Sequence, residues 1–233
     1  MIKTYIIVMK ESQLSVDLST DCINAAKLYD IDPIVWPAVN GLTCNDLFEK
    51  YNISVLDTKA MNHRPGTKGC FLSHYELWLE CVRLNETICI LEHDGYFIRE
   101  IPSDIEDHFT EIMKLDPYQP LANDYEYQQQ VNNSLLRPVD YFNTPAFKST
   151  AKGGKYSPGA YGYLIKPIAA NKLINWAQTV GASPADKHIS ADVVDLKSST
   201  VTIVKLHDFF IKNSISKYSS TKNLLKFIQN AYN

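Results

Sequence analysis

Short apolar runs and helical stripes alternate along the N-terminal part of the chain. Residues 4–8 form an apolar run typical of a strand, and apolar side chains then recur at helical spacing over residues 18–29. Pro33 breaks that helix, and residues 34–36 resume an extended pattern. A strand, a helix and a strand this close together predict a βαβ unit. We therefore expect an α/β protein whose central sheet is mainly parallel and covered on both faces.

A stronger helix is predicted after residues 66–69. Its apolar side chains recur at offsets of four, three and four, as in a helix packed on a core: Phe71, Tyr75, Trp78 and Val82. This start would put Ser73 in the first turn. A shorter helix is expected before it, capped by Thr43 and ending near Tyr51.

The most informative pattern is an apolar run that ends in acidic residues. Residues 87–91 are uninterruptedly apolar, and Glu92, His93 and Asp94 follow directly. Such a run predicts a strand that is buried on both faces. In an open parallel sheet, ligands bind beyond the carboxyl ends of the strands, which is where this pattern puts both carboxylates.

The periodicity is lost after this region and then returns. Residues 116–158 are rich in Asn, Gln, Tyr and Pro, and so long a stretch without a pattern predicts a lid or insertion. Residues 160–165 indicate a strand, and a helix follows from Pro167. No linker is evident, so we expect a single domain over residues 1–233.

Three further elements are expected near the C-terminus. Ser183 and Pro184 read as the cap and the first position of another helix. Residues 201–206 indicate a last strand, and residues 222–229 indicate a terminal helix.

Composition excludes several classes of protein. The 233 residues are 45% hydrophobic and 21% charged, as in an ordinary folded protein. A formal net charge of -3 offers no basic field for nucleic acid, so we expect no nucleic-acid partner. The five cysteines include no CxxC and read as buried free thiols of a reducing compartment. No apolar run reaches the roughly 18 residues of a membrane span, so we expect a cytoplasmic protein without an integral membrane segment.

Glu92 and Asp94 are candidate ligands of a divalent cation. Mg²⁺ and Mn²⁺ take carboxylate oxygens, often together with the oxygens of a diphosphate. The plainer alternative is a strand end that meets water, where acidic residues are common.

Polar residues around the central helix are candidates for anion binding. Ser73, in the expected first turn, and Lys68, with His63 and Arg64 just upstream, suit a phosphate but equally suit solvent. His74 is either a ligand-binding residue or a buried, hydrogen-bonded histidine.

Residues 66–78 (GTKGCFLSHYELW) and the later residues 90–94 (ILEHD) resemble the signature of glycosyltransferase family 25. That signature is a Gly-x-x-Gly-Cys-x-x-Ser-His-x-x-x-Trp helix, followed by a strand ending in Leu-Glu-Asp-Asp. Residues 37–41 (PAVNG), 159–165 (GAYGYLI) and 184–186 (PAD) are further matches. The family includes bacterial lipooligosaccharide galactosyltransferases, which serve lipopolysaccharide biosynthesis, and collagen galactosyltransferases.

The resemblance implies a GT-A-like, Rossmann-like fold and transfer of a hexose, galactose or glucose, from a UDP-sugar to a glycan hydroxyl. It implies Mn²⁺ or Mg²⁺ bound by Asp94, with Glu92 contacting the ribose or a metal-bound water. His207 or Asp208 would be a third metal ligand. The family is regarded as inverting, so the acceptor attacks with the help of a carboxylate base.

Asp186 is the first choice for that base or for acceptor binding, and Asp192 and Asp195 are alternatives on the same predicted helix. The acceptor can be lipid-linked, which would bring the protein to the inner membrane surface.

Two departures keep alternatives open. His93 replaces the middle acid of the triplet, and Lys10 stands near the position of an early arginine of the family. A catalytically impaired sugar-nucleotide or glycan-binding protein is therefore the second hypothesis. A metal-dependent phosphohydrolase that uses the same carboxylates is the third.

Overall fold

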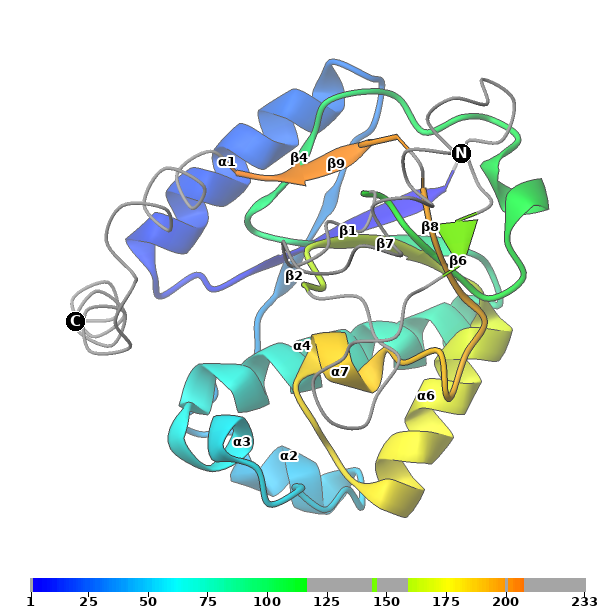
Figure 1. Ribbon diagram of the computed structural model, residues 1–233. Helices are drawn as coiled ribbons and strands as arrows, with labels where there is room; N and C mark the ends of the chain where they lie inside the picture. The colour runs from blue at the N-terminus through cyan, green and yellow to red at the C-terminus, as the bar shows by residue number, and fades with distance from the viewer. Residues whose placement is uncertain (1, 117–143, 146–158, 200, 208–233) are drawn as a thin grey trace, which may run out of the picture.

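The computed structural model describes residues 2–116, 144–145, 159–199 and 201–207 (Figure 1). Helices and strands follow one another as β1 (Lys3–Val8), α1 (Gln13–Lys27), β2 (Ile34–Pro37), α2 (Asn45–Lys50), α3 (Lys59–His63), α4 (Pro65–Leu84), β3 (Ile88–Glu92), β4 (Gly95–Phe97), the 3₁₀ helix η1 (Ile105–His108), β5 (Ile112–Lys114), β6 (Thr144–Pro145), β7 (Gly162–Ile165), α6 (Pro167–Val180), α7 (Ala185–His188), β8 (Leu196–Ser198) and β9 (Val204–Leu206).

The central sheet is largely parallel, as predicted. Its strand order is β2-β1-β3-β7-β5-β8-β6. Strands β1, β2, β3, β5 and β8 share one direction, because β7 pairs antiparallel with both of its neighbours β3 and β5. The other strand of opposite direction is β6, at the edge. Three consecutive parallel strands, β2, β1 and β3, therefore end at the same edge.

Two apolar layers cover the sheet. Side chains at alternate strand positions, such as Ile88 and Ile90 of β3, pack with α4 and α6 on one face. The positions between them, such as Cys89 and Leu91, pack on the other face with α1, β4 and β9. Figure 1 shows α4, α6 and α7 on one side of the sheet, with α1 and the β4–β9 pair on the other. The wholly apolar run of β3 is explained by this burial on both faces.

Several element boundaries differ from the prediction. Helix α4 begins at Pro65, because proline suits the first helical position, so the glycines at 66 and 69 lie inside it. Helix α2 begins at Asn45, with Cys44 and not Thr43 at its cap. Helix α7 starts at Ala185, and Pro184 is its cap.

The last predicted strand is shorter and lies elsewhere. It covers Val204–Leu206 and pairs antiparallel with β4 in a separate two-stranded sheet. The predicted lid at 116–158 lies outside the described residues apart from Asp116 and β6, and the predicted helix at 222–229 lies outside them entirely. The lid and the single domain over 1–233 stay predictions.

In the part of the chain that the structure describes, no helix combines the length and the apolar character needed to cross a bilayer.

Candidate functional site

Glu92 ends β3 and is held by side chains of α4. The Nε2 atom of His74 lies 3.0 Å from Glu92 Oε1, and the Cys70 thiol donates to the same oxygen at 3.3 Å. Cys70 and His74 are four residues apart and so lie on one face of the helix. The prediction that a carboxylate stands at this strand end is confirmed. His74 is buried and hydrogen-bonded, and its role in ligand binding stays a prediction.

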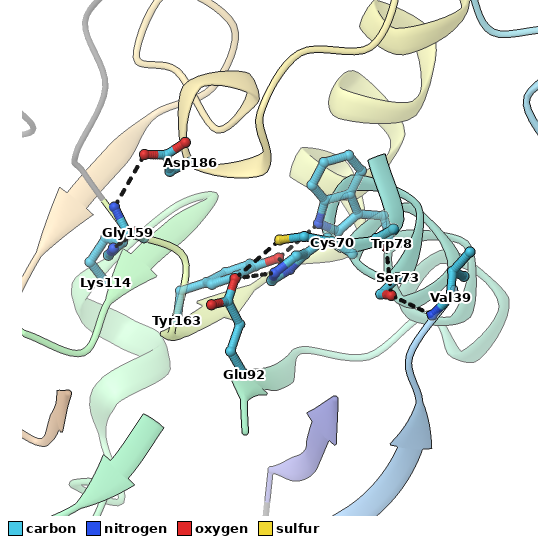
Figure 2. Close-up of polar contacts among 11 residues, drawn as sticks. Val39, Cys70, Ser73, Trp78, Glu92, Lys114, Gly159, Tyr163 and Asp186 are labelled. Carbon is cyan, nitrogen blue, oxygen red and sulfur yellow. Dashed lines mark hydrogen bonds and ion pairs between the residues drawn. The ribbon is translucent and has the colours of Figure 1, made fainter. Parts of the chain in front are cut away.

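Behind His74, the hydrogen bonds continue into the core. His74 Nδ1 lies 2.9 Å from the hydroxyl of Tyr163 on β7, and the indole nitrogen of Trp78 donates to that hydroxyl at 2.9 Å. All three side chains are fully buried. In Figure 2, the Tyr163 side chain reaches toward Glu92 and Cys70, and the Trp78 indole lies above Cys70.

The two strand-end acids differ in charge state. Burial raises the pKa of Glu92, but the hydrogen bond from His74, together with the nearby His93 and the hydrogen bond from the Cys70 thiol, outweighs it, and the net pKa is lowered. Burial, with the Glu92 charge adding to it, raises the pKa of Asp94 to about 8. Glu92 is therefore the ionised member of the pair.

Asp94 has the character of a cation ligand. Its Oδ1 atom is buried and has no hydrogen-bond partner among the described residues. An unpaired buried carboxylate is costly, and a bound cation would remove that cost. The residues at this strand end thus fit a divalent ion.

A second group of ligand atoms lies close by. The Cys70 sulfur, a His74 nitrogen and a Glu92 oxygen lie within 4.8 Å of one another and could hold a metal ion. They include Glu92 of the predicted ligand set, but neither Asp94 nor His207. In this structure, hydrogen bonds already link all three.

Asp186 lies in the same region. Burial raises the pKa of the Cys70 thiol well above its ordinary value, and the charges of Glu92, Asp186 and Asp94 act in the same direction. Asp186 itself is half-buried, and its Oδ2 accepts from the backbone N–H of Gly159 at 3.4 Å (Figure 2). Three acidic side chains therefore act on the electrostatics of one thiol.

Sequence reasoning missed a buried polar group at the end of β5. The Lys114 ammonium donates to the carbonyl of Gly159 and lies 3.8 Å from Asp116. Tyr161 donates to Asp116 at 2.5 Å. Lys114 is only 1% exposed. A lysine at the end of a short apolar strand, with an aspartate two residues later, was the available signal.

Ser73 and Lys68 are placed differently from the prediction. Because α4 begins at Pro65, Ser73 lies in the helix interior and not in its first turn. Its buried hydroxyl donates to the carbonyl of Gly69 and accepts from the N–H of Val39, both at 2.8 Å. Lys68 is half-buried and lies near Cys44. Burial raises the pKa of the Cys44 thiol, and the charge of Lys68 partly offsets that rise.

Asp192 and Asp195 were predicted to lie on the same helix as Asp186. This prediction is wrong, because α7 ends at His188. The backbone turns after that residue: Asp192 contacts Ser190, and Asp195 accepts from Thr110.

His207 comes near Asp94 through its backbone. Its N–H donates to the Asp94 carbonyl at 2.8 Å, whereas its ring nitrogen Nε2 lies 3.4 Å from Asp21 of α1. The imidazole is thus directed to α1 in this structure. Asp208 lies outside the described residues. Burial lowers the pKa of His93, and the backbone carbonyl of His93 accepts from the Cys22 thiol.

A basic pocket adjoins this region. It has a volume of about 310 Å³ and lies where α3, the start of α4 and the start of α7 meet. Its lining consists of Thr58, Lys59, Ala60, Arg64, Ser183, Pro184 and Lys187. Three cationic side chains and no acid suit an anionic group such as a phosphate.

The chain is similar to known proteins in structure and, through a family profile, in sequence. Mouse xyloside xylosyltransferase 1, in its apo form, has a similar structure at a TM-score of 0.36 and 12% identity, over 92% of this chain and 81% of that one. No curated protein matches the chain in sequence. The sequence profile of glycosyltransferase family 25 (LPS biosynthesis protein) matches residues 1–189. The chain therefore belongs to glycosyltransferase family 25 and is a glycosyltransferase.

Proposed function

We propose that the protein transfers a hexose, galactose or glucose, from a UDP-sugar to a hydroxyl of a glycan acceptor. One observation carries the site assignment: the buried Oδ1 of Asp94, which has no hydrogen-bond partner among the described residues, stands beside the ionised Glu92 at the end of β3. Mn²⁺ or Mg²⁺, held by Asp94 with Glu92 beside it, would neutralise the leaving diphosphate. The GT-A-like character implied by the family supports this arrangement.

The chain's own residues would then serve the acceptor. In an inverting transfer, the acceptor oxygen forms a bond to the anomeric carbon as the bond to the diphosphate breaks, and UDP leaves. The proton of the acceptor hydroxyl goes to a carboxylate. Asp186 is our choice for that base, since its charge acts on the same thiol as those of Glu92 and Asp94. Asp192 remains the alternative.

The basic pocket near α7 suits a phosphate of the donor or of the acceptor. A lipid-linked glycan, reached from the cytoplasm at the inner membrane surface, remains a predicted acceptor.

Release of UDP tests this function. With Mn²⁺ and a UDP-hexose, the parent is expected to release UDP steadily. Asp94→Ala is expected to lower the rate of UDP release at least about 100-fold, because the ligand of the cation that stabilises the leaving diphosphate is removed. Asp57→Ala, which changes an exposed carboxylate, is the matched control and should retain the parent rate. Binding without turnover would indicate the catalytically impaired binding protein, and phosphate-ester cleavage without a glycoside would indicate the phosphohydrolase.

A further inference from the structure

The sheet and α4 bring five side chains into one line between them. Tyr163 of β7 is paired directly with Ile90 of β3, and Glu92 lies two residues beyond Ile90 on the same face of the strand. On α4, Cys70, His74 and Trp78 follow at intervals of four. Strand register and helical period therefore place these side chains next to one another, although Tyr163 is 89 residues from His74 in sequence.

The direction of the hydrogen bonds along this line follows from its end. An indole N–H can only donate, so Trp78 donates to the Tyr163 oxygen. The described contacts of that hydroxyl are with Trp78 and His74, so its own hydrogen goes to His74 Nδ1. A neutral imidazole then carries its hydrogen on Nε2 and donates it to Glu92 Oε1. Each donor thus faces an acceptor in a region from which water is excluded.

The outcome is a carboxylate with one fixed oxygen. Oε1 of Glu92 receives hydrogen bonds from His74 and Cys70. No contact of the described residues uses Oε2, and 25% of the Glu92 side chain is exposed. The carboxylate is thus tethered on its inner side and open on its outer side.

We propose that Tyr163 and Trp78 are positioning residues, which act through His74 to orient Glu92 for its ligand. The proposal rests on the proposed function for the identity of that ligand, a divalent cation with UDP. Residues that fix the groups around a metal site commonly change its affinity by roughly 10-fold to 100-fold when they are removed.

The test compares two tyrosine variants by calorimetry of Mn²⁺ binding in the presence of UDP. Tyr163→Phe keeps the ring and removes the hydroxyl that links Trp78 to His74. Tyr75→Phe is the matched control, because Tyr75 is equally buried on the same side of the sheet but its hydroxyl accepts from Gln178, away from Glu92. We expect Tyr163→Phe to weaken Mn²⁺ binding about 10-fold or more. The control should stay within about twofold of the parent.

A purely structural hydroxyl would lower the melting temperature without changing Mn²⁺ affinity in the folded protein. Equal Mn²⁺ affinity in Tyr163→Phe and the parent would therefore overturn the proposal.

Nitrogen-15 NMR of His74 provides a second measurement that is independent of the variants. The parent at neutral pH should show the Nε2–H tautomer, and an Nδ1–H tautomer would overturn the proposed direction. Failure of the proposed function gives a different result. A parent that binds Mn²⁺ and UDP but releases no UDP from any UDP-hexose would reject hexose transfer, while the comparison of the tyrosine variants would still decide the role of Tyr163.

Discussion

At the scale of residues, two acids one position apart have opposite surroundings. Glu92 receives hydrogen bonds from His74 and Cys70, whereas Asp94 keeps a buried oxygen without a partner among the described residues. Pairs of acids whose pKa values are driven apart are typical of functional sites. The arrangement leaves one acid ionised and the other ready to exchange a proton for a cation.

The raised pKa of Asp94 predicts how stability depends on pH without metal. The carboxyl titrates at its ordinary 3.8 in the unfolded chain and at about 8 in the folded protein. Between these values the unfolded chain binds fewer protons, so stability falls as the pH rises, by at most about 1.4 kcal/mol for each pH unit. Asp94→Asn removes this titration.

Urea denaturation in the presence of a chelator would measure the effect. Relative to the parent, Asp94→Asn should gain stability steadily from about pH 4 to about pH 8. The lowered pKa of Glu92 makes stability rise with pH at lower pH values. Because Glu92 is present in both proteins, the comparison isolates the effect of Asp94. A stability difference that does not change with pH would show that Asp94 is ionised in the folded protein.

At the scale of elements, α4 is anchored to the segment after β2 by backbone contact. A Cβ added at Gly69 would lie 2.3 Å from the carbonyl oxygen of Val39 and 2.8 Å from the nitrogen of Gly41. Ser73, one turn further along, bonds the N–H of Val39. Gly69 therefore allows the close approach that sets the start of α4 beside the ends of the parallel strands.

Two glycine variants of α4 test this contact. Gly69→Ala should destabilise the protein by about 1–3 kcal/mol, because both neighbouring atoms belong to the backbone and cannot move aside cheaply. Gly66→Ala is the control: nothing lies within 4 Å of the added carbon, and alanine should stabilise the helix by up to about 1 kcal/mol. Equal effects of the two changes on the denaturation midpoint would contradict the close packing.

At the scale of the whole molecule, the candidate site forms where distant segments meet. Glu92 comes from β3, Cys70 and His74 come from α4, and Asp186 comes from α7. A ligand that bridges these elements binds only the folded protein and must stabilise it.

A UDP-hexose with Mn²⁺, at about 100 times its dissociation constant, should therefore add about 2.7 kcal/mol to the free energy of unfolding. For a chain of this size, that corresponds to a rise in melting temperature of roughly 5–10 °C. Thermal denaturation with a series of nucleotide sugars would measure the rise. The same sugars with a chelator, or with Asp94→Ala, are the controls and should give little stabilisation. An equal rise in the controls would mean that the sugar nucleotide binds without the metal.

The local pattern of the sequence was sufficient for the elements and for the family. Helices α1 and α6 follow from the period of 3.6 residues that burial of one face imposes, and strands β1 and β3 follow from short continuous apolar runs. The run before Glu92 likewise indicated a strand buried on both faces, and the motif around residues 66–78 identified the family.

Only the tertiary structure decided which elements meet. The antiparallel insertion of β7 between β3 and β5, the pairing of β9 with β4, and the contact of Tyr163 with His74 join segments far apart in sequence. Hydrogen-bond partners and strand direction are properties of two segments at once, so the pattern of one segment alone does not contain them. For the same physical reason, the sequence predicted the acids Glu92 and Asp94, whereas the residues that hold Glu92 in place emerged only from the fold.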